Sequence, residues 1–187
     1  LQTQDSRFHG CPYVLELNPC MPKKDQGVSN NRFQIIPRTL IFITRGDRLL
    51  LIKGHPQKRI WAHLYNGIGG HIERGEDVHS AARRELKEEA GLDETELWLC
   101  GIVMIDAGED TGIGLFVFRG ETEQEPIENS AEGTLEWIPF DHLQEYPLVE
   151  DLPILIPRVL SQERSENLFF ARYWYDENDR LKISFAS

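Results

Sequence analysis

The feature that most constrains this chain is the stretch GHIERGE at residues 70–76, followed by RRELKEEAGL at residues 83–92. A glycine-bounded turn leads here into a charged segment typical of a helix. Three glutamates crowd one face of that helix: Glu85, Glu88 and Glu89. They do so because residues three and four apart on a helix are neighbours. Each like-charged pair costs about 0.2–0.5 kcal/mol. We therefore expect a cation outside the helix to compensate them.

The helix itself is predicted from about Asp77 to Ala90, and Gly91 is the expected C-terminal stop. Its apolar positions recur at helical spacing and should face the core: Val78, Ala81, Ala82 and Leu86. A solvated acidic face would be the ordinary interpretation of such a cluster. The glycines of residues 67–75 favour a ligand site instead, because they let backbone groups approach a ligand closely. Oxygen donors on a loop and a helix suit magnesium or manganese bound together with a phosphate.

Composition places limits on the possible partners. Acidic residues outnumber basic ones, 31 against 20, for a formal charge of −11, which argues against binding DNA or RNA polymers. A small phosphorylated ligand stays compatible, because a bound metal supplies positive charge locally. No apolar run approaches the ~20 residues of a membrane span. The sparse cysteines, Cys11, Cys20 and Cys100, predict free thiols in a reducing cytoplasm.

The length of 187 residues suits one domain with an extension. Residues 1–32 are polar and broken by prolines and glycines, which predicts an irregular N-terminal extension. Within it, residues 14–17 either add a short strand or pack against the main body. The domain is predicted at residues 33–187. Residues 39–44 and 49–52 should form a hairpin around the turn at residues 45–48.

Further strands and one more helix complete a mixed α+β class. The helix is predicted from Leu152 to about Gln162, although Pro157 weakens it. The strands are expected at residues 97–105, 115–118, 135–138, 168–175 and 180–185.

Gly70, Glu76 and residues 84–92 fill every fixed position of the pattern GX5EX7REUXEEXGU, where U is aliphatic. In this the chain resembles the Nudix hydrolases. The resemblance implies an α/β/α sandwich around a mixed β-sheet. It also implies magnesium- or manganese-dependent hydrolysis of a nucleoside diphosphate linked to another group.

The resemblance also assigns roles to residues of the box. Glu85, Glu88 and Glu89 become the metal-binding carboxylates, one of which takes a proton as water attacks phosphorus. The carbonyl of Gly69 becomes a further metal ligand, and Arg84 orients the glutamates.

Outside the box, residues 65–72 resemble the MutT-like, 8-oxo-dGTP diphosphatase-like branch of the family. That resemblance gives Asn66 a role in recognising the purine base; the alternative is a turn residue before Gly67. Glu132, five residues before Trp137, becomes an accessory metal ligand or else an exposed loop acid. Lys53 becomes a substrate contact or else a solvated residue at a strand end.

Glu150 and Asp151 fall where this branch has paired acids that recognise the base. The chain departs from the branch here, with a glutamate first and with Leu148–Val149 where a base-stacking aromatic residue is expected.

Three functions follow from these features. The leading hypothesis is a hydrolase that converts a purine nucleoside triphosphate, oxidised forms included, to a monophosphate and pyrophosphate. The second is a Nudix hydrolase for ADP-ribose or a dinucleoside polyphosphate, although those branches tend to carry proline and tyrosine where this chain has Ala107 and Glu109. The third is a non-catalytic nucleotide sensor, a class that usually lacks the box glutamates retained here.

Overall fold

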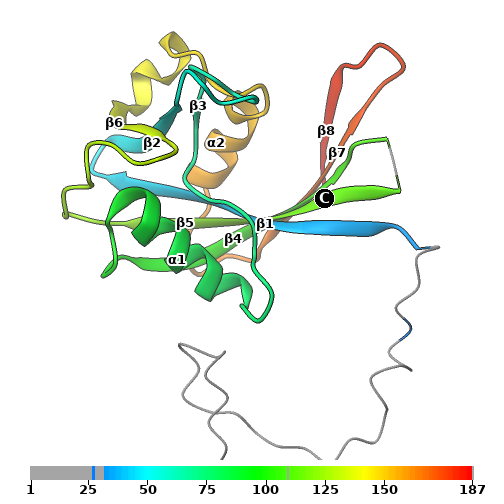
Figure 1. The fold of residues 1–187 in the computed structure, drawn as a ribbon, viewed down its shortest axis with the longest axis horizontal. Helices are drawn as coiled ribbons and strands as arrows, with labels where there is room; N and C mark the ends of the chain where they lie inside the picture. The colour runs from blue at the N-terminus through cyan, green and yellow to red at the C-terminus, as the bar shows by residue number, and fades with distance from the viewer. Residues whose placement is uncertain (1–26, 28–31, 109, 187) are drawn as a thin grey trace, which may run out of the picture.

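The computed structural model describes Gly27, residues 32–108 and residues 110–186. The predicted extension, with its short strand at residues 14–17 and with Cys11 and Cys20, lies outside the described residues except for Gly27 and Arg32. The elements of the described part, drawn in Figure 1, are β1 (Gln34–Arg45), β2 (Arg48–Gly54), β3 (Tyr65–Asn66), α1 (Val78–Ala90), β4 (Glu96–Asp106), β5 (Thr111–Glu121), β6 (Gly133–Pro139), the 3-10 helix η2 (Phe140–Glu145), α2 (Leu152–Leu160), β7 (Phe169–Tyr175) and β8 (Leu181–Phe185).

The strands form one mixed sheet in the order β3-β2-β1-β5-β4-β7-β8, and β6 pairs with β2. The predicted hairpin is confirmed as the antiparallel pair of β1 and β2. Parallel pairing joins β1 to β5 and β4 to β7. The strands predicted within residues 33–187 are all present, most of them longer than expected, whereas the short β3 and η2 were not predicted.

Apolar side chains of β1 alternate between two cores. Leu40 and Phe42 pack in the cluster that contains Leu152 and Leu155 of α2. Ile41 and Ile43 pack in the other cluster, with Ala82, Leu86 and Ala90 of α1. The two helices thus lie on opposite faces of the sheet (Figure 1). A strand buried on both faces is continuously apolar, which explains the run from Leu40 to Ile43 and confirms the predicted α/β/α sandwich.

Local chemistry sets the bounds of both helices. The Asp77 side chain accepts hydrogen bonds from the backbone N–H groups of His79 and Ser80, as an N-cap does. Gly91 adopts the left-handed conformation at φ 69° and donates its N–H to the carbonyl of Lys87, so the predicted stop is confirmed. Helix α2 continues through Pro157 and ends at Leu160, slightly earlier than predicted. No helix in the described residues is long and apolar enough to cross a membrane.

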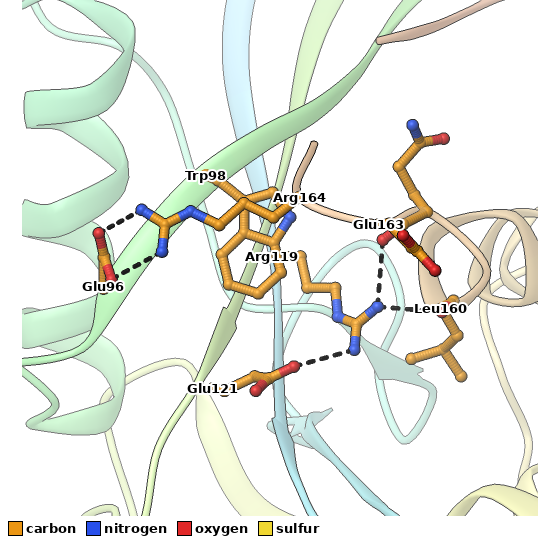
Figure 2. Close-up of a pocket in the computed structure, with 8 residues that line it drawn as sticks. Glu96, Trp98, Arg119, Glu121, Leu160, Glu163 and Arg164 are labelled. Atoms are coloured by element: carbon orange, nitrogen blue, oxygen red, sulfur yellow. Dashed lines mark hydrogen bonds and ion pairs between the residues drawn. The ribbon is translucent and has the colours of Figure 1, made fainter. Parts of the chain in front are cut away.

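A charged hollow of about 500 Å³ lies where β4 and β5 meet the end of α2. We call Glu96, Trp98, Arg119, Glu121 and Arg164 the Trp98 cluster (Figure 2). The two guanidinium groups lie 5.6 and 5.8 Å from the Trp98 ring centroid, where cation–π attraction is favourable.

The hydrogen bonds of the Trp98 cluster tie α2 to the sheet. Arg119 donates to the carbonyls of Leu160 at 2.9 Å and Gln162 at 3.3 Å, and pairs with Glu121 at 3.2 Å. Arg164 pairs with Glu96 through both of its terminal nitrogens. Both guanidinium groups therefore have partners within the fold, while Nε of Arg119 and Nε1 of Trp98 are buried without a hydrogen-bond partner among the described residues.

Candidate active site

The glycine loop, residues 67–75, follows β3 in the sequence and packs against β1 before the chain enters α1. Ile68 and Ile41 exchange backbone hydrogen bonds of 2.7 and 3.1 Å, and Thr39 donates its N–H to the carbonyl of Gly70 at 2.9 Å. A Cβ at Gly70 would lie 2.5 Å from Oε1 of Glu85, closer than real carbon atoms approach. A glycine at this position therefore lets the loop lie directly against the glutamates of α1.

Arg84 holds three carboxylates at once. Its guanidinium donates to Glu76 at 2.7 and 2.9 Å, to Glu85 at 2.8 Å and to Glu88 at 3.2 Å. It also donates to the carbonyl of His71 at 3.0 Å. The hydrogen bonds from Arg84 to Glu76 lower the pKa of Glu76, although burial opposes the shift. The arginine therefore fixes the orientation of two of the three box glutamates.

Glu89 is the buried glutamate of the helix, with 8% of its surface exposed. Its carboxylate accepts the Gly69 N–H at 3.1 Å. Burial raises the pKa of Glu89 to about 7; the Gly69 hydrogen bond opposes the shift, and the charges of Glu85 and Glu132 reinforce it. Glu132, distant in sequence, is thus electrostatically coupled to the helix glutamates.

These groups line one cavity of about 680 Å³. Seven residues predicted for the site lie in its wall: Asn66, Gly69, Glu85, Glu89, Glu132, Glu150 and Asp151. Backbone pairing of Tyr65 with residues 148–149 brings Asn66 close to the paired acids. Burial, reinforced by Glu150, raises the pKa of Asp151 to about 6.

Three predicted residues lie outside the lining. Glu88 is 60% exposed and pairs with Arg84. Arg84 itself contacts Glu85 and Glu88 of α1 and Glu76 and His71 of the preceding loop. The Lys53 ammonium sits 5.5 Å from the Tyr65 ring centroid. The metal-binding role of Glu88, the orienting role of Arg84 and the substrate role of Lys53 stay predictions. Asn66 also forms the turn contact named as its alternative, accepting the Gly67 N–H at 2.8 Å.

Several lining residues escaped the sequence analysis: Arg38, Lys58, Trp61, Tyr173 and Tyr175. The two tyrosines are alternate residues of β7, so strand periodicity could have placed them on one face. Lys58 and Trp61 belong to the loop between β2 and β3, which has no periodic signal.

The donor set fits a hard divalent cation. Carboxylates and a backbone carbonyl are ligands of magnesium and manganese, and the buried Glu89 lies among like charges that a cation would relieve. Within the described ranges, no three His, Cys, Asp or Glu side chains already stand in a metal-binding arrangement. Glu85 turns toward Arg84 and Glu132 toward Lys58, so binding would require these carboxylates to reorient.

A family model for the NUDIX domain matches residues 35–159. The chain belongs to the Nudix family. This confirms the resemblance seen in the sequence and identifies residues 70–92 as the Nudix box of a hydrolase.

Curated relatives and solved structures agree with this assignment. The oxidized purine nucleoside triphosphate hydrolase of Danio rerio is 32% identical over 128 residues, covering 67% of this chain and 80% of the relative. The protein of the same name from Mus musculus is 24% identical over 144 residues, covering 76% and 88%. The mutator MutT protein of Bacillus halodurans has the same fold, with a TM-score of 0.68 at 24% identity, and the match covers 81% of this chain and 97% of that one.

Proposed function

We propose that this Nudix hydrolase converts purine nucleoside triphosphates, oxidised forms included, to monophosphates and pyrophosphate. The observation that carries the proposal is the shared cavity, which has Glu85, Glu89 and Glu132 in its wall together with Asn66 and Asp151. The names of the zebrafish and mouse relatives support the substrate class.

Magnesium or manganese would be held by three carboxylates of the box, Glu85, Glu88 and Glu89. The Gly69 carbonyl and Glu132 would complete the ligand set. Such an ion supplies positive charge against the phosphates and lowers the pKa of a bound water. Arg84 contacts Glu85 at 2.8 Å and Glu88 at 3.2 Å. Glu85 would turn from this contact toward the ion, while Glu76 keeps Arg84 anchored. Without a metal, burial raises the pKa of Glu89 to about 7; a bound cation would lower it and keep this carboxylate ionised as a ligand.

Base recognition is assigned to Asn66, Glu150 and Asp151. An amide offers both a donor and an acceptor to a purine edge. A carboxyl whose pKa is raised to about 6 holds a proton over part of the physiological range, so Asp151 can donate as well as accept. Lys53 remains a proposed contact near the phosphates.

The test is a substrate panel with the purified protein and Mg²⁺: dGTP, its 8-oxo form, ADP-ribose and a dinucleoside polyphosphate. We expect the highest kcat/KM with a purine triphosphate, and pyrophosphate as the released product by ion chromatography. The variant Glu89→Gln, prepared identically, controls for contaminating phosphatases. A higher kcat/KM for ADP-ribose would contradict the substrate class and leave the fold and family unchanged.

A further inference from the structure

Lys58 forms an ion pair with Glu132 inside the cavity. The pair joins the loop between β2 and β3 to the loop before β6. The positive charge of Lys58 also acts on Glu89, whose pKa it lowers against the larger effect of burial. A side-chain cation thus already lies among the carboxylates proposed to hold a metal.

The backbone holds both partners in place independently of their ion pair. His55 donates its N–H to the carbonyl of Glu132 at 3.1 Å, and Lys58 donates its own to the carbonyl of His55 at 2.9 Å. Gly54 closes the base of the loop through bonds of 2.9 and 3.0 Å with Leu64 and His63. The ion pair can therefore open through side-chain rotation, without movement of the backbone.

The ion pair is suited to exchange. The two side chains keep 34% and 45% of their surface exposed, and such pairs are weak. A lysine carries a compact charge on a flexible stem, so its ammonium can leave one oxygen ligand for another within the same cavity. A triphosphate would offer such oxygens.

We propose that Lys58 competes with the divalent metal for Glu132, and that Lys58 displaced by the metal binds the polyphosphate of the substrate. The first half concerns metal binding alone, and the second rests on the function proposed above. Lys58 would then be a substrate-binding residue that is available only when the metal site is filled.

The decisive measurement is Mn²⁺ binding to nucleotide-free protein, by calorimetry or electron paramagnetic resonance. Lys58→Met should bind Mn²⁺ about two- to fivefold more tightly, the range that an exposed ion pair can supply. Arg59→Met is the matched control, because Arg59 belongs to the same loop and carries the same charge but is exposed and outside the cavity lining. In a Glu132→Gln background, Lys58→Met should no longer tighten Mn²⁺ binding, since the competition is gone.

Steady-state kinetics test the second half. Lys58→Met should raise the KM for a purine triphosphate about tenfold, as loss of a charged hydrogen bond does, with a smaller change in kcat. Lys58→Gln should reproduce both effects and exclude a packing artefact of methionine.

The outcomes separate the two proposals. Equal Mn²⁺ affinities of Lys58→Met and Arg59→Met, in an active enzyme, would overturn the competition and leave the function standing. Tighter Mn²⁺ binding with an unchanged KM would overturn the phosphate role. Tighter Mn²⁺ binding in a protein that hydrolyses no triphosphate would support the competition and refute the proposed function. A parent protein that binds no Mn²⁺ would refute both.

Discussion

The cavity at the Nudix box and the Trp98 cluster are both hollows rich in charge, but their charges are satisfied differently. In the Trp98 cluster the Arg164 guanidinium lowers the pKa of Glu96, and Arg119 has two carbonyls and a carboxylate as partners. In the cavity burial raises the pKa of both Glu89 and Asp151. Glu96 is thus stabilised as an anion by its partner, whereas Glu89 and Asp151 are buried without a cation that offsets the cost of their charge.

The largest expected effect tests the cavity. Glu89→Gln should lower kcat by about 10²–10⁴, the contribution of a positioned acid–base group, while the protein stays folded by circular dichroism. The assay uses a saturating purine triphosphate with Mg²⁺. Glu121→Gln, in the Trp98 cluster, is the matched control and should keep its kcat. Near-normal turnover of Glu89→Gln at limiting Mg²⁺ would show that this glutamate is not part of the catalytic site.

In the Trp98 cluster we expect a loss of stability without a loss of activity. Arg119→Met should lower the free energy of unfolding by about 1.5–3 kcal/mol, because it removes charged hydrogen bonds to the end of α2. Its kcat/KM, measured well below the melting temperature, should match that of the parent. Arg164→Met, which breaks an exposed pair, should lose much less stability in the same urea titration. A catalytic defect in Arg119→Met would contradict the assignment of a purely structural role to the Trp98 cluster.

The raised pKa values predict how stability depends on pH. Glu89, raised from 4.5 to about 7, and Asp151, raised from 3.8 to about 6, hold their protons more tightly when folded. The contribution of these two carboxyls to the unfolding free energy in EDTA should therefore be fully present below about pH 4 and fall by on the order of 3–5 kcal/mol as pH rises to 7.

Urea titrations between pH 4 and 7.5 measure this slope. Glu89→Gln should remove the upper part of the slope, between pH 6 and 7. In the parent protein, saturating Mg²⁺ should restore stability at pH 7. A slope unchanged in Glu89→Gln would assign the pH dependence to other groups.

The smallest expected effects concern the hydroxyl groups of two tyrosines, Tyr65 and Tyr173. The Tyr65 hydroxyl donates to Glu136 at 2.9 Å, so Tyr65→Phe should cost about 1 kcal/mol. The buried Tyr173 hydroxyl has no hydrogen-bond partner in the part of the chain described. Tyr173→Phe should therefore leave the melting temperature equal or slightly higher. A clear loss of stability in Tyr173→Phe would reveal a partner for this hydroxyl.

The box was predictable because its determinants are local. The Asp77 cap, the Gly91 stop and the pairing of Arg84 with Glu88 all depend on residues within a few turns of α1. The α+β class and the hairpin of β1 and β2 follow from periodicity and a short turn in the same way. Glu132 could be placed only through the family resemblance.

The remaining site residues depend on long-range pairing, which the sequence does not encode locally. Tyr173 reaches the cavity because β7 pairs in parallel with β4. Lys58 reaches Glu132 because β2 and β6 are neighbours. The position of Lys53 beside Tyr65 likewise depends on the register of β2 with β3, which no motif specifies.

The parallel pairing of β1 with β5 also affects how the protein is made. Residues Gln34–Thr44 find their partners at Thr111–Glu121, so β1 leaves the ribosome long before its neighbour is synthesised. Until then its apolar run, Leu40–Ile43, has only the hairpin partner β2 and one unprotected edge, which is a hazard for aggregation. A nascent chain stopped before residue 111 would therefore leave this edge of β1 exposed, and β5 would cover it once its residues emerge.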